Sequence, residues 1–420
     1  MDSRVEAVLA AVDEEACAQM TMDLVNIPSP PGDEQAIGDY LADRFAELGM
    51  AIQLQEVEPR RNNVIATLPG EGGGDVLLLS GHEDTSTTGD DERLGAGHQA
   101  RASRDGDWVY GLGASNMKAA FPAYYQAIRA LQQAGVRLRG DLLMAAVVGE
   151  TERAAVDRYE GAFYRGGGVG SRHLVTHGLA ADHAIIGEPT GLRITLGNTG
   201  WIHARVTTHG VMQTTWCKEA GVDPFPKMLR VIQAIYDWEP EFQRRHPHPL
   251  MEARVGVSAI EGGYPFKPGK CPPPALNLYL DLRIPPPFTT IQIKRELDEV
   301  LAPLRAEQPE VRLTSDFYFS SQGYEIAASE PVVQATAVAH EVVFGEPAPY
   351  ASPNRYAVSS DCIALDQYHI PGITYGPGGV QQTGSFQNYG TRGEAVNTKN
   401  IAQCARVYAL AAMRLCGVAD

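Results

Sequence analysis

Two short apolar runs, each bounded by glycine, constrain the fold of this chain more than any other feature. Residues 75–80 read Asp-Val-Leu-Leu-Leu-Ser, and residues 141–148 read Asp-Leu-Leu-Met-Ala-Ala-Val-Val. Such runs are typical of strands that are buried on both faces of a sheet. Between them, residues 117–134 are rich in alanine, have helical spacing of apolar positions and end near Gly135. The order strand, helix, strand predicts a parallel sheet with helices on its faces.

Similar elements are predicted towards both ends of the chain. The loop Pro-Ser-Pro-Pro-Gly at residues 28–32 forbids one continuous helix there, and Asp33 is placed to cap the helix that follows. The expected helices are 3–23, 34–48, 330–345, 358–368 and 395–414, and the expected short strands are 184–186 and 373–375.

The middle of the chain has a different pattern. From about residue 194 the apolar residues alternate with a period of two, which is typical of strands with one buried face. The expected order is strand, helix, strand, helix, strand, at residues 202–207, 226–237, 276–283, 289–304 and 311–317. We therefore predict an α/β protein. A small α/β domain at 194–322 is inserted into a larger domain formed by 1–193 and 323–420.

Composition excludes several classes of protein. A formal net charge of −16 over 420 residues argues against a nucleic-acid partner, because phosphate binding needs clustered Lys and Arg. The N-terminal residues lack a basic-then-apolar signal region, and no stretch of 18 apolar residues occurs, so we expect a cytoplasmic protein that does not span a membrane. The six cysteines are scattered without a C-x-x-C pair, which favours reduced thiols over a disulfide framework.

Four polar motifs follow predicted strands or open a predicted helix. They begin at Gly81, Asn116, Gly149 and Gly187, and they read Gly-His-Glu-Asp-Thr, Asn-Met-Lys, Gly-Glu-Thr-Glu and Gly-Glu-Pro-Thr. One such loop would usually be a helix cap or a solvated turn. In a parallel sheet, however, the loops after the carboxyl ends of the strands line the ligand-binding crevice. Four of them together predict a site at that edge.

With these motifs the chain resembles the family of dinuclear zinc amidohydrolases and exopeptidases that includes acetylornithine deacetylase, succinyl-diaminopimelate desuccinylase, aminoacylase and carboxypeptidase G. The resemblance implies a catalytic domain with a mostly parallel sheet flanked by helices and a lid domain that often mediates dimerisation. It also implies two metal ions in the cleft between the domains. The matching segments are residues 80–85, 186–191, 280–283, 360–361 and 375–379.

The resemblance carries over to some of the metal-ligand positions and not to others. His82 and Glu188 match ligands of the first metal, and Asp84 matches the carboxylate that orients the site. Asn116 stands where the family has an aspartate that bridges both metals. Thr151 and Gly390 stand where it has the Glu and the His that bind only the second metal.

These departures predict a site for one divalent ion, Mn or Zn, held by His82, Asn116 and Glu188. An amide oxygen in place of a carboxylate removes one negative charge, so the ion should be weakly held. Two alternatives stay open. The site can lack a metal altogether, because three protein ligands is the usual minimum, or Glu152 can take the ligand position that Thr151 leaves empty.

Glu150 matches the catalytic glutamate of the family and is the candidate general base, against the alternative that it only caps a helix. Lys118 can neutralise charge near the site or be an exposed helix residue. The lid histidine that the family uses to stabilise the tetrahedral intermediate is absent, since residues 210–214 read Gly-Val-Met-Gln-Thr. Candidates for binding an anionic substrate are Lys270, Arg283, Arg355 and Gly378.

We therefore predict a homodimeric hydrolase that cleaves a C–N bond in a small, carboxylate-bearing molecule. The two leading reactions are deacylation of an N-acyl amino acid or dipeptide, and hydrolytic deamination of an activated aromatic amine, as in the nitroanthranilate aminohydrolase branch of the family. Two rival hypotheses are a metal-free enzyme that uses Glu150 and His82 for acid–base chemistry, and a non-catalytic binding homologue.

Overall fold

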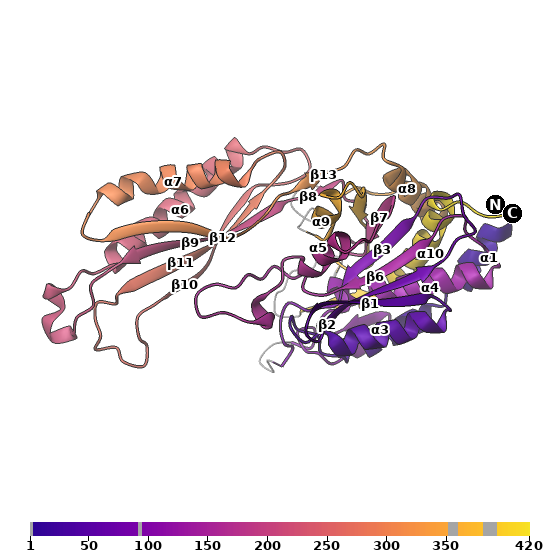
Figure 1. Ribbon diagram of the computed structural model, residues 1–420, viewed down its shortest axis with the longest axis horizontal. Coiled ribbons are helices and arrows are strands. Elements are labelled where there is room, and N and C mark those ends of the chain that lie inside the picture. Colours follow the sequence, from indigo (N-terminus) through magenta and orange to yellow (C-terminus); the bar gives the residue numbers. More distant parts are fainter. Residues whose placement is uncertain (1–2, 91–94, 352–359, 381–392) are drawn as a thin grey trace. The chain divides into compact units, whose positions relative to one another are not determined.

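The computed structural model describes residues 3–90, 95–351, 360–380 and 393–420. The chain forms two compact units (Figure 1). The first unit comprises Met1–Gly197 and Ile326–Asp420, and the second comprises Asn198–Glu325. The second unit thus comprises residues 198–325, whereas the sequence pattern predicted an inserted domain at 194–322.

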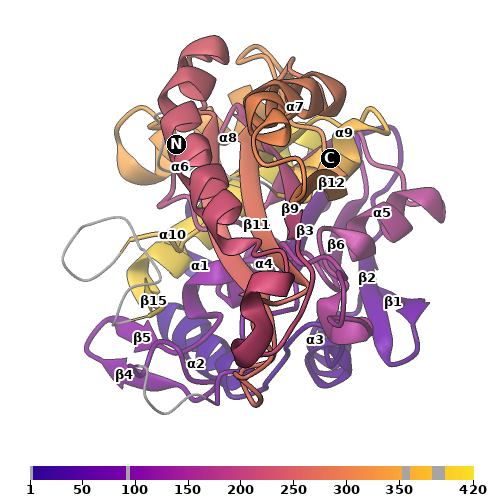
Figure 2. The same cartoon turned by 90° about the vertical axis from the view of Figure 1, so that its left-hand side faces the viewer.

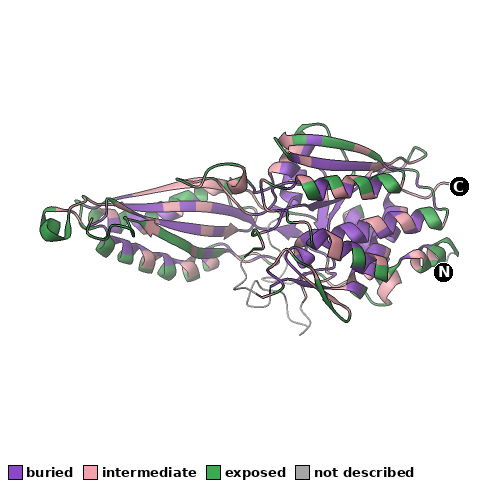
Figure 3. Ribbon diagram, turned by 90° about the horizontal axis from the view of Figure 1, so that it is seen from below, coloured by how far each residue is buried: buried purple, intermediate pink, exposed green. Residues whose placement is uncertain are grey.

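A six-stranded sheet forms the centre of the first unit, in the order β1-β2-β6-β3-β7-β14. Neighbouring strands from β6 to β14 are parallel, whereas β1, β2 and β6 pair antiparallel at the other edge. Every residue of β3, β6 and β7 is buried (Figure 3), which explains why these runs carry no polar alternation. The strands are β1 (Ala51–Glu58), β2 (Arg61–Leu68), β3 (Leu77–His82), β6 (Leu142–Val147), β7 (His183–Ile186) and β14 (Gly372–Thr374).

Helices cover both faces of this sheet. The long helix α10 packs against α2, α4 and α8 on one face, while α5 and α9 contact each other on the opposite face (Figures 1 and 2). The helices of the first unit are α1 (Ser3–Ala11), α2 (Glu14–Val25), α3 (Gln35–Glu47), α4 (Ala120–Gln133), α5 (Val169–Thr176), α8 (Pro331–Phe344), α9 (Cys362–Asp366) and α10 (Thr398–Leu415). A small three-stranded sheet joins β4 (Ser103–Asp105), β5 (Trp108–Tyr110) and β15 (Ala395–Asn397).

Several helix starts differ from the prediction, two of them near an aspartate. The expected helix at 3–23 is two helices, because the Asp13 side chain accepts a hydrogen bond from the Ala16 amide and caps a new helix there. Asp33 does not cap α3, which begins at Gln35. The Asp33 carboxylate instead pairs with Arg60 over 3.3 Å.

The second unit has a four-stranded antiparallel sheet in the order β10-β11-β9-β12. Helices α6 and α7 lie side by side across one of its faces and bury a core of mainly Leu, Ile and Val (Figure 2). The sequence pattern missed β10 and ended α6 eight residues early, at 237 instead of 245. The elements are β9 (Gly200–His209), α6 (Phe225–Arg245), β10 (Arg254–Gly262), β11 (Ala275–Ile284), α7 (Thr290–Ala306) and β12 (Arg312–Ser321).

Within the described part of the chain, no helix has the length and apolar character needed to cross a membrane.

Candidate active site

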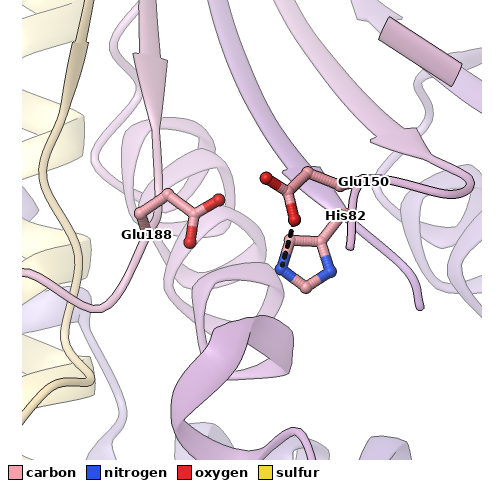
Figure 4. Close-up of side chains that lie close together, drawn as sticks. All are labelled: His82, Glu150 and Glu188. Atoms are coloured by element: carbon pink, nitrogen blue, oxygen red, sulfur yellow. Dashed lines mark ion pairs between the residues drawn. The ribbon is translucent and has the colours of Figure 1, made fainter. Parts of the chain in front are cut away.

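The carboxyl ends of three neighbouring strands bring together a buried histidine and two buried glutamates. His82 ends β3, Glu150 follows β6 and Glu188 follows β7. Because β6, β3 and β7 are parallel neighbours, their ends meet at one edge of the sheet. One potential ligand atom from each of the three side chains lies within 4.8 Å of the others, and the side chains face a common space (Figure 4). Three such donors can hold a divalent metal ion.

The ring of His82 is oriented as in a metal-ligating histidine. Its Nδ1 donates to the carbonyl oxygen of Asp84 over 2.8 Å, so that in the neutral ring the lone pair is on Nε2. Nε2 lies 3.0 Å from the side-chain oxygen of Asn116 and 3.8 Å from a carboxylate oxygen of Glu150. Two ligands of one Zn-sized ion are separated by roughly 3 to 3.5 Å, given bonds of about 2.1 Å. The separation of Nε2 and the amide oxygen therefore suits a shared cation.

Asn116 lies in the short segment Ala114–Lys118 that precedes α4, and its own backbone angles, φ −119° and ψ 97°, are not helical. The carboxylate of Glu394 accepts hydrogen bonds from the backbone amides of Ser115 and Asn116, over 3.1 and 2.8 Å. Gly81 in β3 permits this turn to lie close, because a Cβ there would come within 2.3 Å of the Met117 side chain. Glu394 thus fixes the position of Asn116 from a distant part of the chain.

Asp84 holds the turn that carries Glu150. One of its carboxylate oxygens accepts from the Glu150 amide over 2.9 Å, and the other accepts from the Thr151 amide over 3.0 Å and from its hydroxyl over 2.6 Å. The Thr151 side chain is therefore directed towards Asp84. Asp84 also orients His82, although through its carbonyl oxygen, since its carboxylate is 3.7 Å from Nδ1.

A buried ion pair packs against the same turn. Arg61 makes a two-pronged interaction with Glu34, over 2.7 and 3.0 Å, and both side chains are fully buried. Gly149, with φ of +63°, lies directly against it, because a Cβ there would be 2.5 Å from the Arg61 guanidinium. Burial raises the pKa of Glu34 to about 7, against the opposing effect of Arg61. This pair limits where the chain before Glu150 can lie.

The buried acidic groups of the site favour binding of a cation. Burial raises the pKa of Glu188 well above its usual range, and the charge of Glu150 raises it further. One Glu188 oxygen is buried with no hydrogen-bond partner among the described residues. Burial alone would lower the pKa of His82, but Glu188 and Asp84 outweigh it, so the pKa is raised. A buried orphan oxygen beside an imidazole lone pair and an amide oxygen fits a divalent ion.

Sequence comparison assigns the chain to a family. Residues 78–414 match the model of peptidase family M20/M25/M40. The chain belongs to this family. It is 23% identical over 418 residues to N-formyl-4-amino-5-aminomethyl-2-methylpyrimidine deformylase from Bacillus subtilis, which covers 92% of this chain and 93% of that protein.

Solved structures of M20 relatives share the fold. Human carnosine dipeptidase 1 is 14% identical, with 98% of each chain covered and a TM-score of 0.74. The M20 family metallo-carboxypeptidase Sso-CP2 from Sulfolobus solfataricus is 16% identical, with 99% of each chain covered and a TM-score of 0.68. M20 enzymes depend on metal ions, and relatives of this chain are named as a deformylase, peptidases and amidases. This M20 chain is accordingly a hydrolase that acts on C–N bonds.

Two further residues of this M20 chain lie beside the site. Gly378 packs against Ser115, where a Cβ would come within 2.3 Å of the carbonyl oxygen, and the Gly379 amide donates to the Ser115 hydroxyl over 2.9 Å. Lys118 is fully buried, so the interpretation as an exposed residue was wrong. Its ammonium group donates to the carbonyl oxygens of Leu24 and Ile27, and burial lowers its pKa to about 7.

The remaining candidates are not part of this cluster. Lys270 and Arg283 belong to the second unit, where Arg283 pairs with Asp281 over 2.9 Å. Arg355 and Gly390 lie outside the described residues. Glu152 is half-buried and does not belong to the group of described residues that can share an ion, so the alternative that it replaces Thr151 finds no support here.

The sequence analysis gave no role to Asp361 or Glu394, although both lie at the site. Asp361 is 3% exposed, and its charge acts on the pKa of both His82 and Glu188. The only sequence signal for it was the Ser360-Asp361 pair in the family resemblance. Glu394 comes shortly after Gly390, which stands where the family has the second metal's histidine.

Proposed function

We propose that this protein hydrolyses the amide C–N bond of a small, carboxylate-bearing molecule, with one divalent ion, Mn or Zn, held by His82, Asn116 and Glu188. The observation that carries this proposal is the close approach of His82 Nε2 to the Asn116 oxygen, 3.0 Å, within a buried group that includes Glu188. A divalent ion bound there would polarise the substrate carbonyl and lower the pKa of water towards neutrality.

The hydrogen bonding of Thr151 supports a count of one ion. A threonine at this position offers no carboxylate, and its hydroxyl is already engaged by Asp84 over 2.6 Å. Asn116 likewise offers one neutral oxygen, which suits a terminal ligand better than a bridge between two cations. Both features support a site adjusted to a single ion.

Glu150 is the proposed general base. Its carboxylate oxygen is 3.8 Å from His82 Nε2, beside the proposed metal ligands, where a carboxylate can take a proton from an attacking water. Asp84 holds the Glu150 amide over 2.9 Å and thereby keeps the carboxylate in the site. Glu150 then returns the proton to the departing amine nitrogen as the C–N bond breaks.

The named relatives favour an amide over an aromatic amine. A deformylase, dipeptidases and amidases all cleave the bond between a carbonyl carbon and a nitrogen. We therefore propose N-formyl compounds, N-acyl amino acids and dipeptides as the leading candidate substrates. Hydrolytic deamination of a nitroanthranilate-type amine is the alternative reaction that the substrate screen below tests. Lys270, Arg283, Arg355 and Gly378 remain proposed contacts for the substrate carboxylate, and the homodimer and the cytoplasmic location remain proposals.

The decisive experiment combines metal analysis with reconstitution. Protein purified without chelator should contain one Mn or Zn ion per chain by elemental analysis, lose hydrolysis after dialysis against EDTA, and regain it when either ion is added. Two ions per chain would contradict the single-ion site. Activity that persists in EDTA, with no ion bound, would support the metal-free alternative instead.

A substrate screen completes the test. N-formyl and N-acetyl amino acids, dipeptides and amino-substituted nitrobenzoates are compared with the wild type and with Glu150→Gln as the control. Turnover of amides that Glu150→Gln lacks supports the proposal. Hydrolysis of the nitrobenzoates alone would show that the reaction is deamination. If no compound in the screen is hydrolysed, the result favours a non-catalytic binding homologue.

A further inference from the structure

Arg153, three residues after Glu150, is a half-buried cation without an acidic partner among the described residues. Its Nη1 donates to the carbonyl oxygen of Phe163 over 3.2 Å, and its Nη2 donates to the carbonyl oxygen of Ser86. Burial lowers the pKa of Arg153, and the charge of Asp84 opposes this effect without forming an ion pair. A charge that is partly removed from water is ordinarily paired, so Arg153 is suited to a partner that the chain does not supply.

The two loops that hold Arg153 are the loops that carry the proposed site. Ser86 lies in the loop after β3, two residues after Asp84, whose carboxylate accepts from the Glu150 amide. The Arg153 amide donates to the carbonyl oxygen of Thr151 over 2.7 Å and so continues the turn of Glu150. The guanidinium group therefore joins the loop after β3 to the loop after β6. Both loops leave the same edge of the sheet as the proposed metal ligands.

The guanidinium group of Arg153 is held in place by an aromatic ring. Its Cζ lies over the Phe163 ring, 4.2 Å from the centroid, and Phe163 packs edge to face against Tyr164, with centroids 5.1 Å apart. A guanidinium group has about five N–H donors in a planar fork, and the two carbonyl oxygens accept from only part of them. The remaining donors suit a two-pronged interaction with a planar carboxylate.

Two other cations that the sequence suggested are more fully engaged. Arg283, in the second unit, pairs with Asp281 over 2.9 Å. Lys118 is fully buried and donates to two backbone carbonyl oxygens. Arg153 differs from both, because it combines partial exposure with a charge that no described carboxylate neutralises.

We propose that Arg153 binds the carboxylate of the substrate and so makes the site specific for acids. This inference rests on the proposed function and deepens it, because it assigns the carboxylate to the loop that follows Glu150. The guanidinium group donates two N–H···O bonds to the carboxylate, while Phe163 keeps it in place. A neutral analogue of the substrate would leave these donors without an acceptor and should therefore bind more weakly.

Two matched pairs of probes test this inference. N-formylglycine and N-formylglycinamide differ only in the charge and hydrogen bonding of the terminal group, and so do N-acetylglycine and N-acetylglycinamide. Binding is measured by calorimetry with zinc-loaded Glu150→Gln protein, in which hydrolysis is blocked. At least one acid should bind about tenfold or more tightly than its carboxamide, as expected when one partner of a desolvated charge pair is lost. Equal affinity within both pairs, or no measurable binding of any probe, would overturn the inference.

Variants of Arg153 are needed as well, because the zinc ion also attracts carboxylates. Arg153→Gln in the same background should remove the preference for the acid. Arg158→Gln, which changes an arginine that stacks on Tyr159 in the same loop, should keep it. Arg153→Met, whose side chain can still pack on Phe163, is the second neutral variant if the glutamine variant does not fold.

A preference that survives in either folded variant would assign the carboxylate to the zinc ion or to another cation, and would overturn the inference. An equal loss of affinity for acid and carboxamide would also overturn it, by showing that Arg153 only supports its loop. If the wild type hydrolyses no amide, the proposed function fails instead. A preference for acids that depends on Arg153 would still support this inference in that case.

Discussion

The hydroxyl of Thr151 donates a 2.6 Å hydrogen bond to the carboxylate of Asp84. Residue 151 stands where the family has a glutamate that binds the second metal ion, but in this chain its side chain makes a hydrogen bond instead. It helps to hold the carboxylate that organises the turn of Glu150. Threonine at position 151, in place of the family's glutamate, therefore both removes a metal ligand and adds this hydrogen bond.

Replacing Thr151 with valine should destabilise the protein. Valine keeps the shape but leaves Asp84 without its shortest donor, and a hydrogen bond to a charged group contributes about 1.5–3 kcal/mol to the free energy of unfolding. Urea unfolding of zinc-loaded protein measures the change. Thr151→Ser, which retains a hydroxyl, is the matched control. Equal stability of the valine variant and the wild type would show that the hydrogen bond contributes little.

Replacing Glu150 with glutamine should reduce kcat by about 10²- to 10⁴-fold, because an amide cannot accept the proton of water. Metal content and melting temperature should stay near those of the wild type, since the Asp84 hydrogen bond reaches the backbone of residue 150. Steady-state kinetics on any amide that the screen identifies provides the measurement. A variant that keeps its activity would remove Glu150 from the role of base.

Replacing Asn116 with aspartate should tighten metal binding. Replacing it with alanine should weaken metal binding by about tenfold or more, because even the loss of a residue that only hydrogen-bonds to a metal ligand has an effect of this size. The aspartate restores one negative charge without changing the size of the side chain. Competition with a chromogenic chelator gives the affinities. If all three proteins bind zinc equally, Asn116 does not contact the ion.

Replacing Arg61 alone with methionine should lower the free energy of unfolding by about 3–5 kcal/mol, because Glu34 is left as an unpaired charge in a fully buried position. The double variant Glu34→Leu, Arg61→Met removes both charges and should recover most of that loss. Denaturant unfolding at pH 8 compares the two. An equally large loss in the double variant would mean that the shape of the pair matters more than its charge.

The metal-free protein should lose stability as the pH rises from about 4.5 to 7. Burial raises the pKa of Glu34 from 4.5 to about 7, so the folded chain holds this proton more tightly than the unfolded chain does. The stabilisation is complete below pH 4.5 and is lost towards pH 7. Asp361, with a pKa raised by burial to about 6, acts in the same direction.

Urea unfolding in EDTA across this range measures the slope, and Glu34→Gln should reduce it. Zinc-loaded protein should show the opposite trend, because the ligands must lose their protons before they bind the ion. A metal-free protein whose stability rises over the same range would contradict the pKa assigned to Glu34.

Much of the first unit could be predicted because its central strands are buried on both faces and therefore carry an unbroken apolar signal. The same signal pointed to His82, Glu150 and Glu188, since His82 ends such a strand and each glutamate comes shortly after one. Strands at the antiparallel edge were missed. β1 has several exposed residues, so its sequence lacks the apolar density of β3 and β6.

Other parts of the site depend on contacts that no local pattern reports. A lysine near a helix start is usually exposed, whereas Lys118 is buried and donates to the carbonyl oxygens of Leu24 and Ile27 at the end of α2. The sequence analysis gave Asp361 no role, because its closeness to His82 and Glu188 appears only in three dimensions.

The bond between Glu394 and the Asn116 amide joins residues 278 positions apart. During translation, the second unit is complete once residue 325 has emerged, because it is continuous in sequence. His82, Asn116, Glu150 and Glu188 have all been synthesised by then, yet the carboxylate that fixes Asn116 has not. A nascent or prematurely terminated chain that lacks residue 394 therefore also lacks the carboxylate that holds the backbone of Asn116.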